Sequence, residues 1–226
     1  MGRTLDERRR DRRDAVLDAA LELFGTGGYS STTVGQLCRA AGISTRSFYE
    51  EFENREAVLD ALYARCLDTL LGAVDGPARA ARESAAPDRV DPLEVARQQI
   101  DGFVDLLTGD PRLTRIIFVE LVGGGVDGEL KRRASRRDFA SYIASEAESL
   151  ASAGMIPPGD YLLLATALVG ALAELMVEWS HTPAAERPQR EALLATIYRL
   201  FLSFRGATAG RERARAPTEP HRDPPP

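Results

Sequence analysis

Apolar residues recur at helical spacing over most of the chain, and no stretch alternates apolar and polar positions as a strand does. Glycine and proline interrupt the pattern, for example at Gly42, at residues 123–125 and at residues 157–158. The pattern therefore predicts an all-α fold. The predicted helices span residues 14–24, 34–41, 44–52, 54–71, 93–107, 110–122, 126–153, 160–180 and 191–204.

A closely spaced pair of helices is predicted from Val34 to Phe52, VGQLCRAAGISTRSFYEEF. Thr33 and Gln36 have the spacing of a capping box, and Ser44 is a favourable N-cap for the second helix. Gly42 suits the left-handed position that ends the first helix. Such a pair is typical of a helix-turn-helix unit, whose second helix lies in the DNA major groove, although an ordinary hairpin in an all-α core has the same spacing.

The residues around this pair favour the DNA-binding interpretation. They contain, in order, Leu23-Phe24, Gly28-Tyr29, Thr32-Thr33-Val34, Ala40-Ala41-Gly42-Ile43-Ser44, Phe48-Tyr49, Phe52 and Arg55-Glu56. In these pieces and their spacing, residues 17–62 resemble the N-terminal domain of the TetR family of bacterial transcriptional regulators. The rest of the chain resembles that family in length and helical content.

The resemblance implies a three-helix DNA-binding domain at residues 14–71 and a larger helical domain, for regulation and dimerisation, at residues 72–206. Residues 72–92 lack a clear period and are predicted to form a loop. Residues 207–226 are rich in Arg, Pro and Glu, which predicts disorder. Residues 1–13 are rich in arginine: they form either a solvated helix start or frayed tail, or an arm that places cations on DNA phosphates. These arginines are Arg3, Arg8, Arg9, Arg10, Arg12 and Arg13.

Candidate DNA-binding residues follow from the family pattern. They are Thr33, Ser44, Thr45, Arg46, Ser47, Tyr49 and Arg55. The resemblance implies that residues 45–47 face base edges, where Arg46 can pair with guanine O6 and N7 for about 1–3 kcal/mol of discrimination. Thr33, Tyr49 and Arg55 match positions that contact phosphates.

Two features of the second helix concern residues that do not read DNA. Phe48 and Phe52 are predicted to be core residues. Glu50 and Glu51 depart from the family pattern. Acids facing DNA would repel its phosphates. We therefore expect both carboxylates on the flank of the helix.

The second domain is expected to hold a small-molecule effector in an apolar cavity with a few polar groups. Aromatic candidates for its walls are Phe103, Phe118, Tyr142 and Trp179, and acids within apolar stretches are Glu120, Glu146 and Glu174. Such acids more often face solvent or bind a helix start. An acid that does line the cavity would favour a cationic or hydroxylated apolar ligand.

A single helix-turn-helix unit reads only a few base pairs, so we expect a homodimer on a pseudo-palindromic operator. The helices at about 160–180 and 190–205 carry more apolar surface than one chain of this size needs, and the resemblance implies a four-helix interface made from them. The alternative is that other helices of the same chain cover them.

Repression is the family's usual mode of regulation, and it is relieved when ligand shifts the population of conformations. A DNA-binding adaptor whose second domain binds a protein is the alternative function.

Composition excludes several other classes. The formal net charge of −5 argues against non-specific coating of polyanions. Neither cysteine adjoins a histidine and no metal-spaced cluster occurs, so no enzyme, metal or cofactor is expected; Cys38 and Cys66 are predicted to be buried free thiols. The apolar stretch 161–180 contains Glu174 and Glu178, which disfavours a membrane span. No secretory signal is expected, and the predicted location is the cytoplasm.

Overall fold

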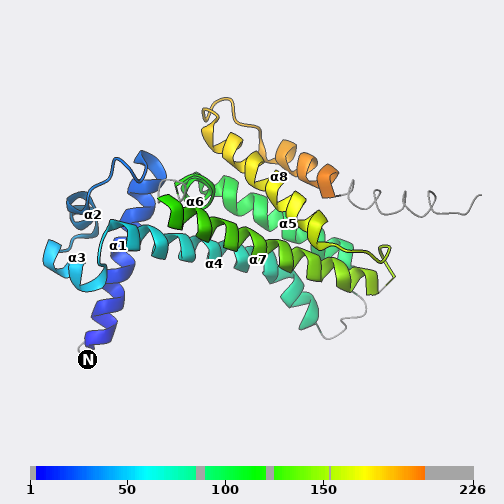
Figure 1. The fold of residues 1–226 in the computed structure, drawn as a ribbon, viewed down its shortest axis with the longest axis horizontal. Coiled ribbons are helices and arrows are strands. Elements are labelled where there is room, and N and C mark those ends of the chain that lie inside the picture. Colours follow the sequence, from blue (N-terminus) through cyan, green and yellow to red (C-terminus); the bar gives the residue numbers. More distant parts are fainter. Residues whose placement is uncertain (1–3, 85–89, 121–124, 153, 202–226) are drawn as a thin grey trace, which may run out of the picture.

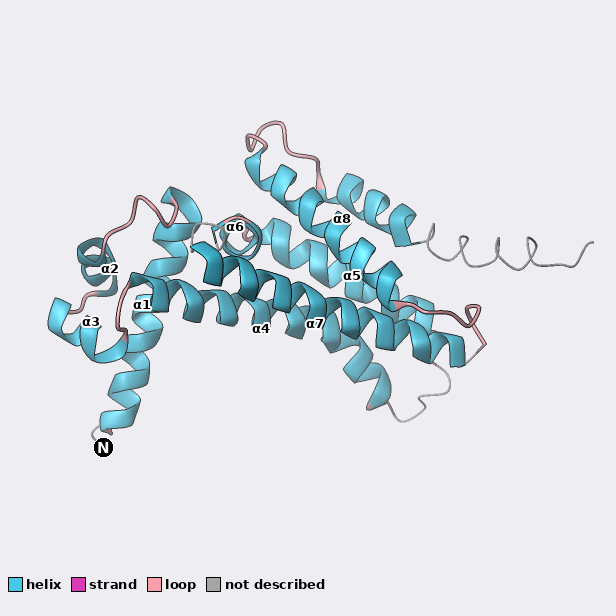
Figure 2. Ribbon diagram, viewed as in Figure 1, coloured by secondary structure: helices cyan, strands magenta, loops and turns pink. Residues whose placement is uncertain are grey.

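The protein is built from helices that form a small N-terminal domain and a larger bundle (Figure 1). The computed structural model describes residues 4–84, 90–120, 125–152 and 154–201. The helices in order are α1 (Leu5–Gly27), α2 (Val34–Ala41), α3 (Thr45–Glu51), α4 (Arg55–Arg82), α5 (Pro92–Gly109), α6 (Pro111–Phe118), α7 (Gly125–Ser152) and α8 (Leu162–His181). Residues 190–201 form a further helix. The described residues contain no strand, and the all-α prediction is confirmed (Figure 2).

The N-terminal domain packs α1, α2 and α3 around the first turns of α4 at one end of the molecule (Figure 1). Its centre consists of fully buried apolar side chains that the helical periodicity places on the inner faces: Phe24, Leu37, Phe48, Val58 and Leu62. α4 then leaves this domain and continues into the larger bundle. One rigid element therefore belongs to both domains.

The larger domain packs α4, α5, α6, α7, α8 and the helix at 190–201 together. Val104, Leu107, Ile116 and Met176 are completely buried and share one core with the N-terminal domain. A second, smaller cluster of small apolar residues and Tyr161 joins α7 to α8. Because the main core is continuous from α1 to the last helix, a displacement in one domain can be transmitted to the other by packing.

The Arg-rich N-terminal segment is helical from Leu5 onward, so a frayed tail is wrong for residues 5–13, while the phosphate contacts of an arm stay a prediction. Thr4 and Glu7 form a capping box: the Glu7 amide donates to Thr4 Oγ1 (3.2 Å), and the Thr4 amide donates to Glu7 Oε2 (2.7 Å). Of the alternatives for this segment, the helix start is the one observed. Residues 1–3 lie outside the described residues, as do 202–206 at the end of the last predicted helix and the predicted disordered tail at 207–226.

Helix α4 extends to Arg82, so the loop predicted to begin at residue 72 is wrong for its first part. Val74 and Ala78 are buried in the bundle, and this packing favours the helix although Pro77 lies within it. Pro77 lacks the N–H that would bond the Ala73 carbonyl, and α5 approaches α4 at that carbonyl. A Cβ on Gly102 would lie 2.9 Å from the Ala73 oxygen, so only glycine fits this crossing.

Candidate DNA-binding site and ligand cavity

The predicted caps of α2 and α3 are present. The Thr33 side chain accepts from the Gln36 amide (3.3 Å), while the Thr33 amide donates to Gln36 Oε1 (2.7 Å). Gly42 has a φ of 67°, in the left-handed region that favours glycine. Ser44 caps α3 by accepting from the Ser47 amide (3.1 Å). These local bonds fix the turn, and with it the direction in which α3 leaves α2.

The first turn of α3 points outward, and the opposite face of the helix is buried. Thr45 and Arg46 are exposed, as is Tyr49, and the Arg46 side chain is 91% accessible. Phe48 and Phe52 are buried, as predicted. The α3 helix therefore presents polar side chains to the outside while its aromatic residues anchor it to the domain.

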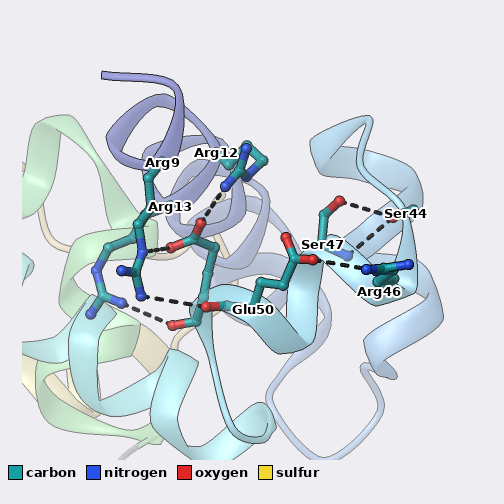
Figure 3. A network of polar contacts seen from close by, with 8 residues as sticks. Arg9, Arg12, Arg13, Ser44, Arg46, Ser47 and Glu50 are labelled. Carbon is teal, nitrogen blue, oxygen red and sulfur yellow. Dashed lines mark hydrogen bonds and ion pairs between the residues drawn. The ribbon is translucent and has the colours of Figure 1, made fainter. Parts of the chain in front are cut away.

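The exposed polar residues already make local contacts. Arg46 Nε lies 3.4 Å from Glu50 Oε1, one turn further along α3 (Figure 3). The hydroxyl oxygens of Ser44 and Ser47 are 2.9 Å apart. Such exposed pairs contribute little to stability, about 0–1 kcal/mol, so Arg46 can exchange Glu50 for a nucleic-acid partner.

Arg55 lies at the start of α4, beside the α1–α2 connection. Its guanidinium donates to the Thr32 carbonyl and lies 4.2 Å from the centre of the Tyr29 ring. Asn54 caps α4 by accepting from the Ala57 amide (2.8 Å). Arg55 is half-buried, so its first role in this structure is to hold the loop before α2, and its predicted phosphate contact stays a prediction.

Glu51 lies on the side of α3 that faces α1, a contact that the expected flank position did not include. Its side chain is only 2% accessible and lies against the first turns of α1, where Arg9 and Arg12 bind the carboxylate (Figure 3). Spacing along the chain could not reveal this contact, because its partners lie 42 and 39 residues earlier. Glu50 alone is exposed, as expected.

Glu120 was a candidate cavity residue, but it lies at the joint between the two domains. Its carboxylate accepts from the Tyr29 amide (2.7 Å) and from Arg115 Nε (2.6 Å). Arg115 also donates to the Thr26 carbonyl (3.0 Å). The end of α6 and the end of α1 are thus linked by a buried acid, which sequence spacing could not reveal.

A second part of the same joint surrounds Arg112. This guanidinium binds Glu22 of α1 (2.7 Å) and Asp110 (2.8 Å), and its hydrogen bonds hold the pKa of Asp110 below its ordinary value. A Cβ on Gly25 would lie 2.5 Å from Arg112 Cβ. The close approach of α1 and α6 therefore depends on glycine at this position.

The larger domain contains a cavity of about 490 Å³, within the ~300–1,000 Å³ range of small-molecule sites. It lies between α4, α5, α7, α8 and the helix at 190–201. Its apolar walls include Val74, Ile100, Phe103, Phe139, Leu168 and Ile197. Three of the seven candidates, Phe103, Tyr142 and Glu146, line this cavity.

Four polar residues of the cavity wall, Arg82, Gln99, Tyr142 and Glu146, are joined in one cluster with Asp75, which lies outside the wall. Gln99 Nε2 donates to the Tyr142 hydroxyl (2.9 Å), which donates to Asp75 Oδ1 (3.2 Å). Arg82 lies 3.0 Å from Asp75 and 3.6 Å from Glu146. Burial, together with the Glu146 and Asp75 carboxylates, raises the pKa of Tyr142 well above its ordinary value, so the hydroxyl stays protonated. The wall itself therefore contains one carboxylate, Glu146, and one guanidinium, Arg82, with the Asp75 carboxylate behind them.

The remaining cavity candidates lie elsewhere, and for them the prediction is wrong. Phe118 packs against the main core, and Glu174 is exposed on α8. Trp179 is buried where α8 turns toward the last helix: its indole N–H donates to the Pro188 carbonyl (3.3 Å), and Arg187 lies 4.6 Å from the ring centre. These residues lie outside the cavity. Their apolar or acidic character alone could not show whether they line the cavity or lie elsewhere in the fold.

One side of α8 is exposed although the helix is strongly apolar. Leu163 is 76% accessible, and Ala167, Gly170 and Glu174 follow it on the same face. Among the described helices, α8 has the length and hydropathy that a membrane span needs, but it packs against α6 and α7 in the bundle, as core helices of the same composition do. The exposed face is therefore a surface that a second molecule could cover.

An exposed, capped recognition helix joined by a shared helix to a second helical domain defines a helix-turn-helix transcriptional regulator. Residues 16–62 match the family described as bacterial regulatory proteins, tetR family. The resemblance to the TetR family found in the sequence is therefore confirmed for these residues.

Curated relatives are named as regulators as well. The chain is 25% identical over 211 residues to the HTH-type transcriptional regulator AcrR of Shigella flexneri, covering 89% of this chain and 94% of that protein. It is 39% identical over 61 residues to the HTH-type transcriptional repressor KstR2 of Rhodococcus jostii, covering 27% of this chain and 30% of KstR2. The second match is about as long as a single DNA-binding domain of this type.

Solved structures share the fold over most of the chain. The fatty acid degradation regulator FadR of Bacillus halodurans superposes with a TM-score of 0.67 at 19% identity, over 84% of this chain and 92% of that one. FadR of Bacillus subtilis, in complex with stearoyl-CoA, has a TM-score of 0.65 at 19% identity, over 83% and 94%. FadR of Thermus thermophilus, a TetR-family repressor in complex with lauroyl-CoA, has a TM-score of 0.60 at 21% identity, over 84% and 93%.

Proposed function

We propose that the protein is a dimeric transcriptional repressor that binds a pseudo-palindromic operator and is released by a small apolar ligand. The observation that carries this proposal is that one helix, α4, begins beside the recognition helix and ends in the cavity wall. A ligand that displaces the Ala78 to Arg82 end of α4 acts on the element that supports α3. The cavity also favours a small molecule over the protein partner of an adaptor.

Dimerisation is supported by the exposed face of α8 and its neighbour. On the helix at 190–201, Ala192, Ala195 and Thr196 are exposed, and on α8 Ala167 and Gly170 are exposed between Leu163 and Glu174, so both helices include small side chains on their outward faces. Small residues allow helices of two subunits to approach closely. Each subunit would then contribute one recognition helix, about one duplex turn from its partner, to successive major grooves.

The ligand proposed for the cavity has an aliphatic body and an uncharged or cationic polar head. The walls are apolar, and two of the three related FadR structures named above hold acyl-CoA molecules. At the polar edge, Glu146 lines the cavity and Asp75 lies behind it against Arg82 and Tyr142, so a fatty carboxylate placed there would lie near more negative than positive charge. A hydroxyl or amine can donate to the Glu146 carboxylate instead.

Ligand and DNA would favour different conformations of the same dimer. Ligand that binds one conformation more tightly shifts the population toward it, and reciprocity requires that operator DNA weaken ligand binding by the same factor. Two routes are available for this coupling: α4 itself, and the α6–α1 joint at Glu120 and Arg112.

The test begins with selection of duplexes from a randomised pool by the purified protein. Operator affinity is then measured with dodecanol, dodecylamine, laurate and lauroyl-CoA. We expect dodecanol or dodecylamine to weaken operator binding by about 5- to 150-fold, the usual range of allosteric coupling, and laurate to have less effect. Ala147→Trp, which fills the cavity at a lining position remote from α3, should keep operator binding and lose this response.

Failure to select any preferred sequence would contradict the regulator proposal. A selected operator whose affinity none of these compounds changes would instead favour the adaptor alternative. Weakening by laurate and lauroyl-CoA only would retain the ligand cavity and refute the assignment of the polar head.

A further inference from the structure

We propose that Glu51 is a positioning residue for DNA recognition, which fixes α3 against the N-terminal turns of α1 without touching DNA. This inference rests on the DNA-binding function proposed above. Glu51 is the last residue of α3, at the opposite end from the outward first turn that contains Arg46. Figure 3 shows that Arg9, Arg12 and Arg13 approach this end of the helix from α1.

The carboxylate of Glu51 is held at both oxygens. Arg9 Nε lies 3.0 Å from Oε2, and Arg12 Nη2 lies 2.9 Å from Oε1. The Glu51 side chain is 2% accessible, so water cannot replace these partners while the domain keeps this arrangement. Because a buried charge without partners is costly, α3 cannot shift away from α1 without losing this stabilisation.

Arg9, together with the neighbouring Arg13, also binds the backbone at the end of α3. Arg9 donates to the Glu50 carbonyl (3.5 Å), Arg13 donates to the Glu51 carbonyl (3.2 Å), and Arg13 also lies 4.4 Å from the centre of the Phe52 ring. The last carbonyls of a helix lack partners within the helix, and cations are favourable there. Both ends of α3 are thus fixed, by Ser44 at one end and by α1 at the other.

A helix as short as α3 needs such external contacts. It has seven residues, whereas isolated helices shorter than about 12–15 residues are marginal in water. Phe48 anchors one face of α3, but a single anchored face leaves rotation and tilt of the first turn less restricted. The contacts of Glu51 with two positions of α1, one turn apart, restrict that motion and hold the reading side chains in a constant direction.

Removal of the Glu51 carboxylate has opposite effects on affinity for the preferred sequence under two hypotheses: that it only repels phosphates, or that it positions α3. Loss of a negative charge near DNA strengthens binding, because fewer phosphates are repelled. Loss of a positioning contact weakens binding to the preferred sequence and leaves binding to random DNA unchanged or stronger, since Arg9 and Arg12 become free to meet phosphates.

The experiment compares Glu51→Gln with Glu53→Gln in the full-length protein. Glu53 is exposed two residues away, so its substitution removes the same charge without removing the contact with α1. Affinities are measured over a range of salt concentrations for a duplex selected by the wild-type protein and for a random duplex. We expect Glu51→Gln to lower the specific-to-random affinity ratio by about 10- to 100-fold, as for a lost hydrogen bond to a charged group, and Glu53→Gln to leave it unchanged.

An unchanged ratio in Glu51→Gln, with folding confirmed by circular dichroism, would overturn the inference while leaving the proposed function intact. Failure of the wild-type protein to select a sequence would count against the proposed function itself. If Glu51→Gln does not fold, Arg9→Gln replaces it: Arg9 is 66% accessible, and Arg12 still pairs with Glu51. We expect a smaller loss of the same ratio in Arg9→Gln, and no loss would refute the role of this contact.

Discussion

Arginine side chains near the recognition helix are held by partners in the same chain. Arg9 and Arg12 bind Glu51, Arg46 binds Glu50, and Arg55 binds the Thr32 carbonyl. The chain as a whole has a net charge of −5, so contact with DNA depends on single arginines held in fixed positions and not on an overall positive charge. Among them, Arg46 combines a weak partner with the greatest exposure.

Arg46→Ala tests direct reading at the residue scale. Removal of the guanidinium should cost about 1–3 kcal/mol on the selected operator and relax the preference at one base position, because a bidentate contact with guanine is lost. Competition binding against operators substituted at each base pair measures both effects. Equal loss on operator and random DNA would show that Arg46 contacts phosphate instead.

At the scale of elements, α4 combines a proline in its interior with a close crossing. The N–H missing at Pro77 leaves the Ala73 carbonyl without its helical partner, and Gly102 of α5 packs directly on that carbonyl. The crossing lies between the half of α4 that supports the DNA-binding domain and the half that lines the cavity. Contact at this point therefore governs how the two halves are aligned.

Gly102→Ala should destabilise the protein by about 1–3 kcal/mol, since the new methyl group meets backbone that cannot move aside easily. Urea unfolding with linear extrapolation measures the change. Gly72→Ala is the matched control: it lies in α4 with open space around it, and should stabilise by about 0.4–1 kcal/mol. Similar effects from both substitutions would show that the crossing tolerates separation of the helices.

The elements that sequence predicted well are those fixed by local bonds. Thr33, Gly42, Ser44 and Asn54 act on residues within a few positions, so their spacing was sufficient. The errors arose where tertiary packing decided the outcome. Burial of Val74 and Ala78 carries α4 past the predicted loop start and through a proline.

Among the functional residues, too, those set by local structure were predicted and those set by tertiary packing were not. The outward turn of α3 follows from its periodicity, whereas the cavity and the domain joint depend on which distant helices meet. Glu120 and Glu146 looked equivalent in the sequence, as acids within apolar stretches. One proved to link α6 to α1, and the other to line the cavity.

At the scale of the whole molecule, dimerisation is proposed to pair the exposed faces of α8 and the helix at 190–201. Gly170→Glu places a charged side chain on this face, and the open space around Gly170 means that the monomer itself accommodates it. Burying an unpaired charge at the interface is costly, so we expect at least about a tenfold weaker dimer and a corresponding loss of operator affinity.

Sedimentation velocity over a range of concentrations measures this change. Gly72→Glu is the control, since it adds the same charge to an exposed helical position on α4 with equally open surroundings. A Gly170→Glu protein that stays dimeric would place the interface on another surface.

Trp179 is the only tryptophan in the chain, and it is enclosed where α8 turns toward the last helix. Its intrinsic fluorescence therefore originates from one known place, beside the proposed subunit contact and on the helix that supplies Leu168 and Leu172 to the cavity. Emission from unlabelled protein can thus follow rearrangement of this corner in real time, with Arg187 next to the ring as a charge whose displacement would shift its wavelength.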